Sequence, residues 1–469
     1  MKKIATKLLS LFSVLLLCAA ICVSFFCLSF PDAVNAAWDG SIAASFASGS
    51  GTESNPYLIK TTAQMGYFLK QYASGVTYEG LHIRLENSLD MTGATWSYSH
   101  GTAFEGTFNG NGYTITADCP LFDDIGENGT LKGLNYTTIQ TSVDRSLLCD
   151  YNKGTIDSCV CYGDVYLKAS VNSESGVICT KNLGTVKNCG AIGNIEVRGD
   201  DNSAYAAMIR SNSGTVSNCF SALTVYANGS GKYSEEKYDP LTLGTTSGCY
   251  YNADLYTKTA QSGVGLTTAQ MKSGEFLASL MGTSVPGTNW VTGPHGYPAL
   301  AHCSMDYAYA DGYQNEKNIV YFSSGKTFTL RSTNSSASVY YTLDGSDPTS
   351  SSTRKSVKSG GTVSVSGDAV LTVVPYYNST YGTISRLDII SLPGSGTASA
   401  PYQITTKKQL KAIALYPDKY FKLLNNITFT ESDFTFGGVM AGGWVPVEKF
   451  SGTLDGNEYA ISGLQGQSI

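Results

Sequence analysis

The sequence predicts an all-β protein built around a right-handed parallel β-helix with short capping helices. Three features support this prediction: units that repeat every 30 residues, short β-branched or alternating stretches inside each unit, and frequent Gly and Asn between them. Further along the chain, short alternating runs predict a small antiparallel β-sandwich, and the start of a second β-helix module follows it. With 50 Gly, 31 Tyr and only 14% charged residues, the composition is globular rather than disordered.

Residues 1–36 have the pattern of a secretory signal peptide. Three Lys residues precede an apolar run over residues 8–30, and small residues lead up to Ala36. We expect cleavage after Ala36; the alternative is an uncleaved anchor, because the run is long enough to cross a bilayer. Both interpretations place the rest of the chain outside the cytoplasm, secreted or at the cell surface. No stable membrane span is expected unless the signal stays uncleaved.

Charge and histidine content limit the classes of function. The chain has 31 Lys and Arg against 37 Asp and Glu, a net charge of -6, and no basic run follows the N-terminus. Nucleic acid is therefore not an expected partner. Only 4 His are present, and none is clustered with Cys, Asp or Glu, so few residues are available for histidine-based catalysis. No cofactor is expected.

The repeat is clearest around four Cys residues. The stretches NKGTIDSC, NLGTVKNC and NSGTVSNC begin at residues 152, 182 and 212, and a fourth Cys follows after the same interval. One such unit cannot bury its apolar face alone, so successive units are expected to stack as coils, with equivalent residues about 4.8 Å apart. The four residues are Cys159, Cys189, Cys219 and Cys249.

Stacking gives each repeated residue type an expected role. The β-branched residues should form an interior ladder, the Asn side chains should pass hydrogen bonds from coil to coil, and the Gly residues should permit the corner. The Cys residues should form an interior column of small apolar side chains. The other three sets are Ile156, Val186 and Val216; Asn152, Asn182 and Asn212; and Gly154, Gly184 and Gly214.

Metal binding and disulfides are the competing interpretations of the Cys residues. We expect no metal site, because no CxxC pair is present and the sulfurs of Cys159 and Cys161 are expected on opposite faces of a strand. Disulfides between stacked Cys fit poorly, because parallel Cβ vectors do not suit the geometry of the bridge. Nine Cys remain after residue 36, an odd number unlike a disulfide framework.

The repeated stretches resemble the GLUG-motif repeats of bacterial surface proteins. SGVICTKNLGTVKNCGAIGNIEV, from Ser175, is similar to the family pattern GGLVGxNxGTIxNCxxxGxV, and the resemblance covers roughly residues 127–250. The resemblance implies a β-helical surface protein of a bacterium, and we expect a Gram-positive one. Some GLUG repeats accompany a zinc peptidase, but the HExxH motif that such an enzyme needs is not in this sequence.

A second, larger repeat joins the two ends of the chain. GSGT followed by NPY at 49–57 reappears as GSGT followed by APY at 394–402, and FEGTFNGNGYTI at 104–115 reappears as FSGTLDGNEYAI at 450–461. Each copy should contain an amphipathic helix that covers the open end of the β-helix. The apolar positions of these helices are Met65, Phe68, Leu69 and Tyr72, and Leu410, Ile413 and Ala414.

These features give the predicted domain order. A parallel β-helix covers residues 38–302, ending in a terminating cap at 261–302 where the pentapeptide TTAQM recurs. The sandwich covers 305–392, and 393–469 is an incomplete second copy of the opening module. Within the sandwich, Asp344 and Gly345 predict a tight hairpin.

The string VYYTLDGSDPTSSST, beginning at Val339, resembles the chitobiase/β-hexosaminidase C-terminal domain. That family is an immunoglobulin-like accessory module of secreted carbohydrate-active and cell-surface proteins. The resemblance implies no catalysis, and it favours surroundings rich in polysaccharide.

Candidate functional residues are few. Tyr376, Tyr377 and Tyr381 are candidates for stacking on sugar rings, with packing as the simpler alternative. The pairs at 123–124 and 200–201 could supply hydrolase carboxylates, but we expect them to be solvated loop residues. His295 and His302 are expected to make local hydrogen bonds.

Two functions remain open. The first is a non-catalytic surface or secreted protein that adheres to, or binds, an extracellular glycan or a host or cell-surface component. The alternative is a polysaccharide lyase or glycoside hydrolase with its groove along the β-helix. That enzyme needs stacked charges on one coil face, yet the equivalent positions hold Asp157, Lys187 and Ser217.

Overall fold

The computed structural model describes residues 37–94, 96, 102–142, 146–168, 176–198, 205–227, 238–256, 260–293, 295–313, 319–434, 444, 447 and 449–466. The predicted signal at 1–36 lies outside them. Within the described ranges, no helix is both long and apolar enough to cross a bilayer. The structure is mostly β-strand, with few helices, and contains extended parallel sheets, as the all-β prediction requires.

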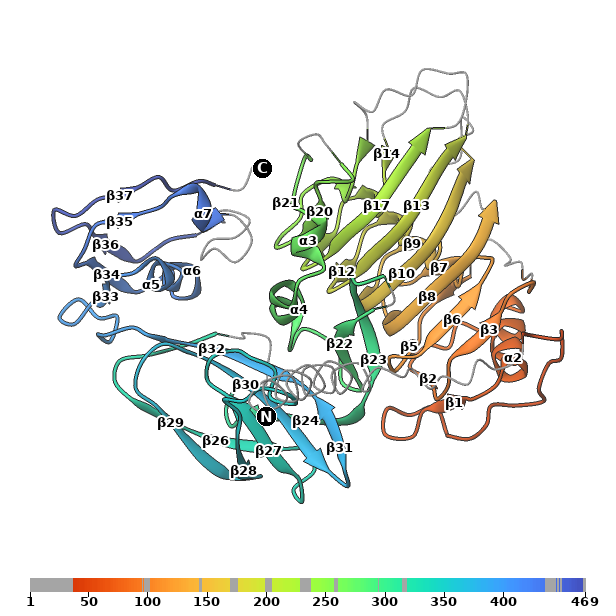
Figure 1. Cartoon of the computed structure of the whole chain (residues 1–469), viewed down its shortest axis with the longest axis horizontal. Helices are drawn as coiled ribbons and strands as arrows, with labels where there is room; N and C mark the ends of the chain where they lie inside the picture. The colour runs from red at the N-terminus through yellow and green to blue at the C-terminus, as the bar shows by residue number, and fades with distance from the viewer. Residues whose placement is uncertain are drawn as a thin grey trace, which may run out of the picture. The chain divides into compact units, whose positions relative to one another are not determined.

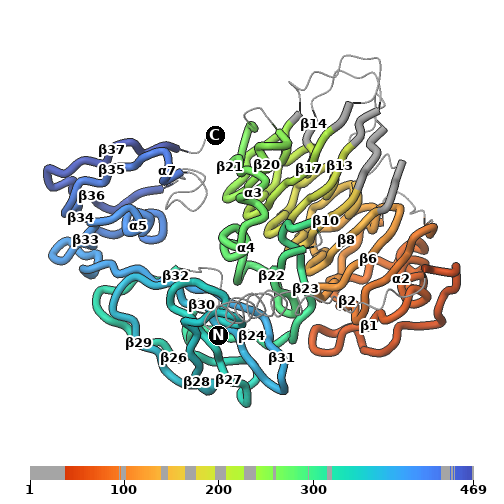
Figure 2. Tube along the Cα trace, in the orientation of Figure 1, coloured from red at the N-terminus to blue at the C-terminus, as the bar shows by residue number. Residues whose placement is uncertain are grey.

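Two parallel sheets form what we call the parallel stack, residues 57–266 (Figures 1 and 2). The larger sheet includes two further pairs of short strands beside its main strand order. In these, β3 (Leu89–Met91) pairs with β6 (Thr114–Ala117), and β12 (Thr185–Lys187) pairs with β16 (Thr215–Ser217). The larger sheet has the order β1 (Tyr57–Ile59), β2 (His82–Leu85), β5 (Thr107–Asn109), β8 (Thr130–Ser142), β10 (Thr155–Lys168), β13 (Gly190–Arg198), β17 (Phe220–Ala227), β20 (Tyr250–Asn252) and β21 (Val264–Leu266). The smaller sheet has the order β19 (Thr242–Leu243), β15 (Ile209–Asn212), β11 (Cys179–Asn182), β9 (Cys149–Asn152), β7 (Asp124–Ile125) and β4 (Ala103–Phe104).

The interval of 30 residues sets the register of neighbouring strands. Ile156 pairs with Val186, and Val186 pairs with Val216, and all three are at most 2% exposed. The Asn ladder is also confirmed, because the Nδ2 of Asn152 donates to the Oδ1 of Asn182 at 2.8 Å and Asn182 donates to Asn212 at 2.8 Å. Each coil is therefore joined to the next by an apolar contact and a side-chain hydrogen bond at equivalent positions.

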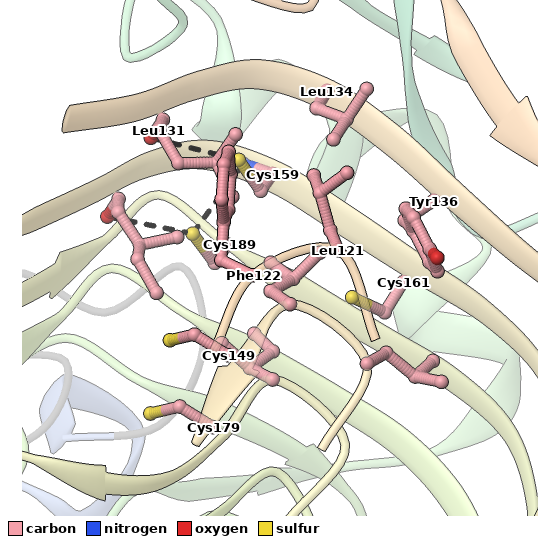
Figure 3. Packing of buried hydrophobic residues seen from close by; sticks show 14 of the residues in the cluster. Leu121, Phe122, Leu131, Leu134, Tyr136, Cys149, Cys159, Cys161, Cys179 and Cys189 are labelled. Atoms are coloured by element: carbon pink, nitrogen blue, oxygen red, sulfur yellow. Dashed lines mark hydrogen bonds between the residues drawn. The ribbon is translucent and has the colours of Figure 1, made fainter. Parts of the chain in front are cut away.

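The repeated Cys residues line the interior of the parallel stack as free thiols. The backbone N–H of Cys159 donates to the sulfur of Cys189 at 3.4 Å. Figure 3 shows Cys149 and Cys179 on adjacent strands with their sulfurs pointing the same way, and their Cα atoms are register partners. The expectation that Cys159 and Cys161 face opposite ways is wrong: both lie in the interior core, because strand side chains alternate with a period of two.

The repeated glycines are needed for a different reason from the one expected. Gly154, Gly184 and Gly214 do not have the left-handed φ of a glycine corner. Instead, a Cβ on Gly184 would lie 2.2 Å from the carbonyl oxygen of Gly154, and a Cβ on Gly214 would lie 2.1 Å from that of Gly184. The coils approach one another so closely at this line that no side chain fits.

Helix α2 (Thr62–Ala73) confirms the predicted helix of the first module, residues 38–125. The hydroxyl of Thr61 accepts a hydrogen bond from the N–H of Gln64 and caps the helix. Its apolar face is buried, and the ring of Phe68 lies 6.1 Å from the rings of both Phe104 and Phe122. The helix thus packs on the interior side chains of the first coils.

The predicted cap at 261–302 divides into two parts. Strand β21 is the last strand of the large sheet, whereas residues 267–302 pack against a different surface. Helices α3 (Thr268–Met271) and α4 (Gly274–Leu280) and the hairpin of β22 (Thr288–Thr292) and β23 (Pro298–His302) form this segment. Their apolar side chains share a cluster with Val160, Ile192 and Phe220, which point outward from the large sheet. The segment therefore covers the outer face of the sheet rather than its end. The ring of Phe220 contacts those of Phe276 and Trp290 there.

The predicted sandwich region is β-rich with mostly antiparallel pairing. Most of its strands share one core, which includes Phe328, Leu330, Val339 and Val373. The strands are β24 (Ser304–Ala310), β25 (Ile319–Phe322), β26 (Lys326–Ser332), β27 (Ser338–Thr342), β28 (Lys355–Lys358), β29 (Gly361–Val365), β30 (Ala369–Tyr377), β31 (Thr380–Thr383) and β32 (Ser385–Ser391).

The tight hairpin predicted at Asp344 and Gly345 is wrong. Strands β27 and β28 pair antiparallel, but a long connection joins them. The carboxylate of Asp344 holds this connection, accepting from the N–H of Ser346 at 3.0 Å and from the hydroxyl of Thr353 at 2.8 Å. An Asp side chain that bonds its own loop competes with the two-residue turn. A two-residue hairpin instead lies at Asn378 and Ser379, both with positive φ.

The second module, residues 393–469, repeats the pairing of the first. Strands β33 (Tyr402–Ile404), β34 (Tyr420–Leu423) and β36 (Thr453–Asp455) are parallel, and β35 (Ile427–Thr428) pairs with β37 (Ile461–Ser462). Its helix is broken into α5 (Lys407–Leu410) and α6 (Ala412–Leu415), and a short α7 (Glu431–Phe434) follows. Leu410 and Ile413 are buried as expected, whereas Ala414 is exposed.

Candidate functional site

The candidate site is a hollow of about 450 Å³ beside helix α2, which we call the aromatic hollow. Four parts of the first module form it: the loop before β1, the first residue of β1, the outer face of α2, and the loop between α2 and β2. Tyr67 and Gln71 are four residues apart on α2 and therefore point the same way, opposite the buried face. The lining residues are Ser45, Phe46, Ser48, Gly49, Tyr57, Tyr67, Gln71, Val76, Tyr78 and Leu81.

The rings of the aromatic hollow are held in a fixed arrangement. Phe46 stacks on Tyr57 with ring centroids 4.6 Å apart, and Tyr67 meets Phe46 edge-on at 5.2 Å. Backbone bonds fix the loop, because the N–H of Ala47 donates to the oxygen of Leu58 and the N–H of Leu58 donates to that of Ser48, both at 2.9 Å. The ring surfaces are therefore positioned before any ligand arrives.

The polar groups of the aromatic hollow are all neutral. Hydroxyls come from two Ser and three Tyr residues, and Gln71 adds an amide. Burial raises the pKa of Tyr78 above its ordinary value, so its hydroxyl stays protonated. Flat apolar ring faces next to neutral hydrogen-bonding groups suit a neutral ligand with both apolar and hydroxyl surfaces. Because the lining carries no carboxyl group, it offers no acid and base pair for glycoside hydrolysis.

The predicted Tyr candidates separate in the structure. Tyr376 and Tyr381 come together, with ring centroids 4.7 Å apart, and both rings contact Tyr340. Arg354 lies over the Tyr340 ring at 5.1 Å and donates to the Tyr381 hydroxyl at 3.0 Å. These rings are only partly exposed, which fits the simpler interpretation of packing.

Tyr377 points away from the other two, because neighbouring strand residues face opposite sides. Its side chain is 44% exposed and borders a small hollow of about 50 Å³ with Asp306 and Thr380. The Asp306 carboxylate is held by the hydroxyl of Thr333 at 3.1 Å. This hollow is much smaller than the 300 Å³ or so of an ordinary ligand pocket. Tyr377 can supply one stacking surface, but not an enclosed site.

The other candidate residues have mixed outcomes. Asp123 is buried at 3% exposure, so its assignment to a solvated loop is wrong, and Asp124 is half-buried on β7. Residues 200–201 lie outside the described residues. The Nδ1 of His302 donates to the backbone oxygen of Asn111 at 2.8 Å, and its ring stacks on Tyr113. Within the described part of the chain, no group of His, Cys, Asp and Glu is placed to hold a metal ion.

Sequence reasoning missed the aromatic hollow. Phe46, Tyr57 and Tyr67 stand in a loop, a strand and a helix, so no regular spacing connects them. The one available signal is Tyr57 at the end of the repeated GSGT turn, and that repeat by itself indicates only a duplicated module.

We expect the nine Cys residues after residue 36 to be unreactive in the folded protein. Burial raises the pKa of Cys119 and Cys303 to about 12, and it also raises the pKa of Cys189 and Cys219 well above the ordinary value of a thiol. At pH 8 a thiol with a pKa of about 12 is only about 0.01% thiolate, and the thiolate is the reactive form. Labelling with iodoacetamide at pH 8, read by peptide mass spectrometry, should modify these residues only after denaturation. Fast labelling of Cys189 or Cys219 in the native protein would contradict their interior placement.

Comparison with known proteins covers parts of the chain. Residues 328–422 match the family model described as Fn3 associated, which supports the resemblance to the chitobiase C-terminal domain over most of the sandwich region and extends into β34. The chain is also 34% identical over 164 residues to a protein of Evansella cellulosilytica named "Putative Gly-rich membrane protein". That match covers 30% of this chain and only 18% of the relative. No solved structure matches the chain significantly. The GLUG resemblance has no counterpart in these matches and stays a prediction.

Proposed function

We propose that the protein is a cell-surface or secreted bacterial repeat protein that binds an extracellular glycan without cleaving it. The aromatic hollow carries this proposal. Its rings are positioned in advance, and its polar groups are uncharged hydroxyls and an amide. A sugar presents an apolar C–H face to a ring and hydroxyls to such groups, so the two surfaces are complementary.

The rest of the chain supports a surface location. The N-terminal pattern is that of an exported protein, the Fn3-associated match lies in a segment that resembles a carbohydrate-associated accessory domain, and the relative is named a membrane protein. In this proposal the parallel stack is a right-handed parallel β-helix that serves as a stiff spacer, and residues 305–392 are an immunoglobulin-like sandwich. The polysaccharide-degrading alternative has less support, because the stacked position of Asp157, Lys187 and Ser217 does not keep one charge.

Substituting Tyr67 tests the site. Tyr67→Ala removes one ring of the aromatic hollow while keeping a good helix former on α2. On a polysaccharide that retains the wild-type protein, we expect binding to weaken about tenfold, which corresponds to about 1.4 kcal/mol. Affinity electrophoresis in gels containing the polysaccharide measures this change.

Two other Tyr variants make the comparison specific. Tyr151 and Tyr377 are each 44% exposed, and Tyr151 lies on the parallel stack away from the aromatic hollow. Tyr151→Ala should bind as the wild type does. If Tyr377→Ala weakens binding while Tyr67→Ala does not, the ligand surface lies on the sandwich region and the aromatic hollow is not the site.

A further inference from the structure

The second module has an open sheet edge whose counterpart in the first module is covered. Tyr402 pairs with Phe421 as Tyr57 pairs with Ile83, so the opening strands of both modules have the same register. The next strands are β5 and β36. Thr453 on β36 is the counterpart of Thr107 on β5.

In the first module, β8 covers the outer edge of β5. Leu131 on β8 pairs with Phe108 in parallel register. The turn after β5 also contributes, because Gly110 donates its N–H to the oxygen of Lys132 and Gly112 donates to that of Gly133, both at 2.8 Å. Strand β8 thus pairs with β5 and also accepts hydrogen bonds from the turn that follows β5.

The turn after β36 has the same conformation as the turn after β5. Asn457 and Glu458 have φ of 45° and 63°, close to the 54° and 77° of their counterparts Asn111 and Gly112. The N–H of Tyr459 donates to the oxygen of Gly456 at 2.7 Å, as that of Tyr113 does to Gly110. The N–H groups of Gly456 and Glu458 are therefore oriented like those of Gly110 and Gly112, which donate to β8 in the first module.

The apolar side chains at this edge are uncovered. Phe108 and Phe104 are fully buried, whereas their counterparts Leu454 and Phe450 are 37% and 42% exposed. In the first module, Phe104 pairs with Ile125 on β7, just as Phe108 pairs with Leu131 on β8. Within the described residues, no strand pairs with the outer side of β36.

We propose that the outer edge of β36 and the turn after it bind, in parallel register, a further coil with the pattern of residues 124–135. Such a coil places one apolar side chain opposite Phe450 and another opposite Leu454, and it offers two successive carbonyl oxygens to Gly456 and Glu458. The first module identifies this partner, because each of these groups has its satisfied counterpart there. Pairing with the same edge of a second copy would run antiparallel and would not supply the second apolar residue.

Grafting the chain's own coil onto the second module tests the proposal. Thr453 and Ile461 each lie 346 residues after their counterparts Thr107 and Ile115, so position 470 corresponds to Asp124. The full chain is extended after Ile469 with residues 124–142. Hydrogen–deuterium exchange followed by mass spectrometry then compares the amides of residues 450–462 with and without the extension. We expect these amides to exchange at least tenfold more slowly with the extension.

A matched control carries Leu131→Asp within the grafted copy only, and it should leave exchange at the level of the unextended chain. Exchange around Gly110 and Gly112 serves as an internal reference for correct folding and should be the same in all forms. Equal exchange with and without the native extension overturns the proposal. So does protection of residues 453–458 in the unextended chain that depends on protein concentration and is lost in Leu454→Asp, because the occupant is then a second copy.

Discussion

Replacing Val186 with Asp should destabilise the parallel stack by about 4 kcal/mol at pH 7. Val186 is fully buried and pairs with Ile156 on one side and Val216 on the other. A carboxylate there has no partner and loses its hydration, which is the costly form of charge burial. Urea denaturation followed by circular dichroism measures the change in the free energy of unfolding.

The loss should depend on pH. Burial raises the pKa of the new carboxyl group in the folded state above its unfolded value of about 3.9. The part of the destabilisation that comes from the buried charge is therefore absent below about pH 3.9, and it grows as pH rises toward the pKa of the folded state. As a matched control, Ser217→Asp puts the same group at the outward position that Asp157 occupies, next to Lys187, and should leave stability nearly unchanged. Wild-type stability in Val186→Asp would contradict the interior assignment.

Replacing Gly184 with Ala should cost about 3 kcal/mol, the upper range for overpacking. The new Cβ would lie 2.2 Å from the carbonyl oxygen of Gly154, and backbone cannot move aside as the end of a side chain can. The coils must separate locally, which weakens the hydrogen bonds between Thr155, Thr185 and their neighbours. The shift of the denaturation midpoint in urea measures this cost.

Gly367→Ala is the control for this prediction. A Cβ at Gly367 meets no atom within 4 Å, and its φ is not left-handed, so stability should change by less than about 0.5 kcal/mol. If Gly184→Ala and Gly367→Ala change the stability by the same amount, the close approach of successive coils at Gly154 and Gly184 is wrong.

The sequence predicted best what the repeat constrains directly. An interval of 30 residues places Ile156, Val186 and Val216 in register, and the same interval aligns Asn152, Asn182 and Asn212. Because the spacing is the same in each coil, a repeated side chain lies next to its equivalent in the adjacent coil. The duplicated modules were likewise visible from their shared turns, and their strands pair in the same register.

Features that depend on contacts between distant segments were not predictable in this way. The outward packing of Phe276 and Trp290 on Phe220 joins residues far apart in the chain, so the sequence does not predict that residues 267–302 lie on the outer face of the large sheet. The aromatic hollow joins a loop, a strand and a helix that have no common period. The role of Gly184 depends on a carbonyl oxygen of the preceding coil, which local sequence does not reveal.

We propose that the protein binds glycan and does not cleave it. The most direct measurement incubates the protein with a panel of insoluble host and plant polysaccharides, recording both the protein retained and the new reducing or unsaturated sugar ends released. We predict retention on at least one polysaccharide, weakened in Tyr67→Ala, with no release above that from the polysaccharide alone. Steady release of new ends that scales with protein concentration would contradict the account and favour the polysaccharide-degrading enzyme.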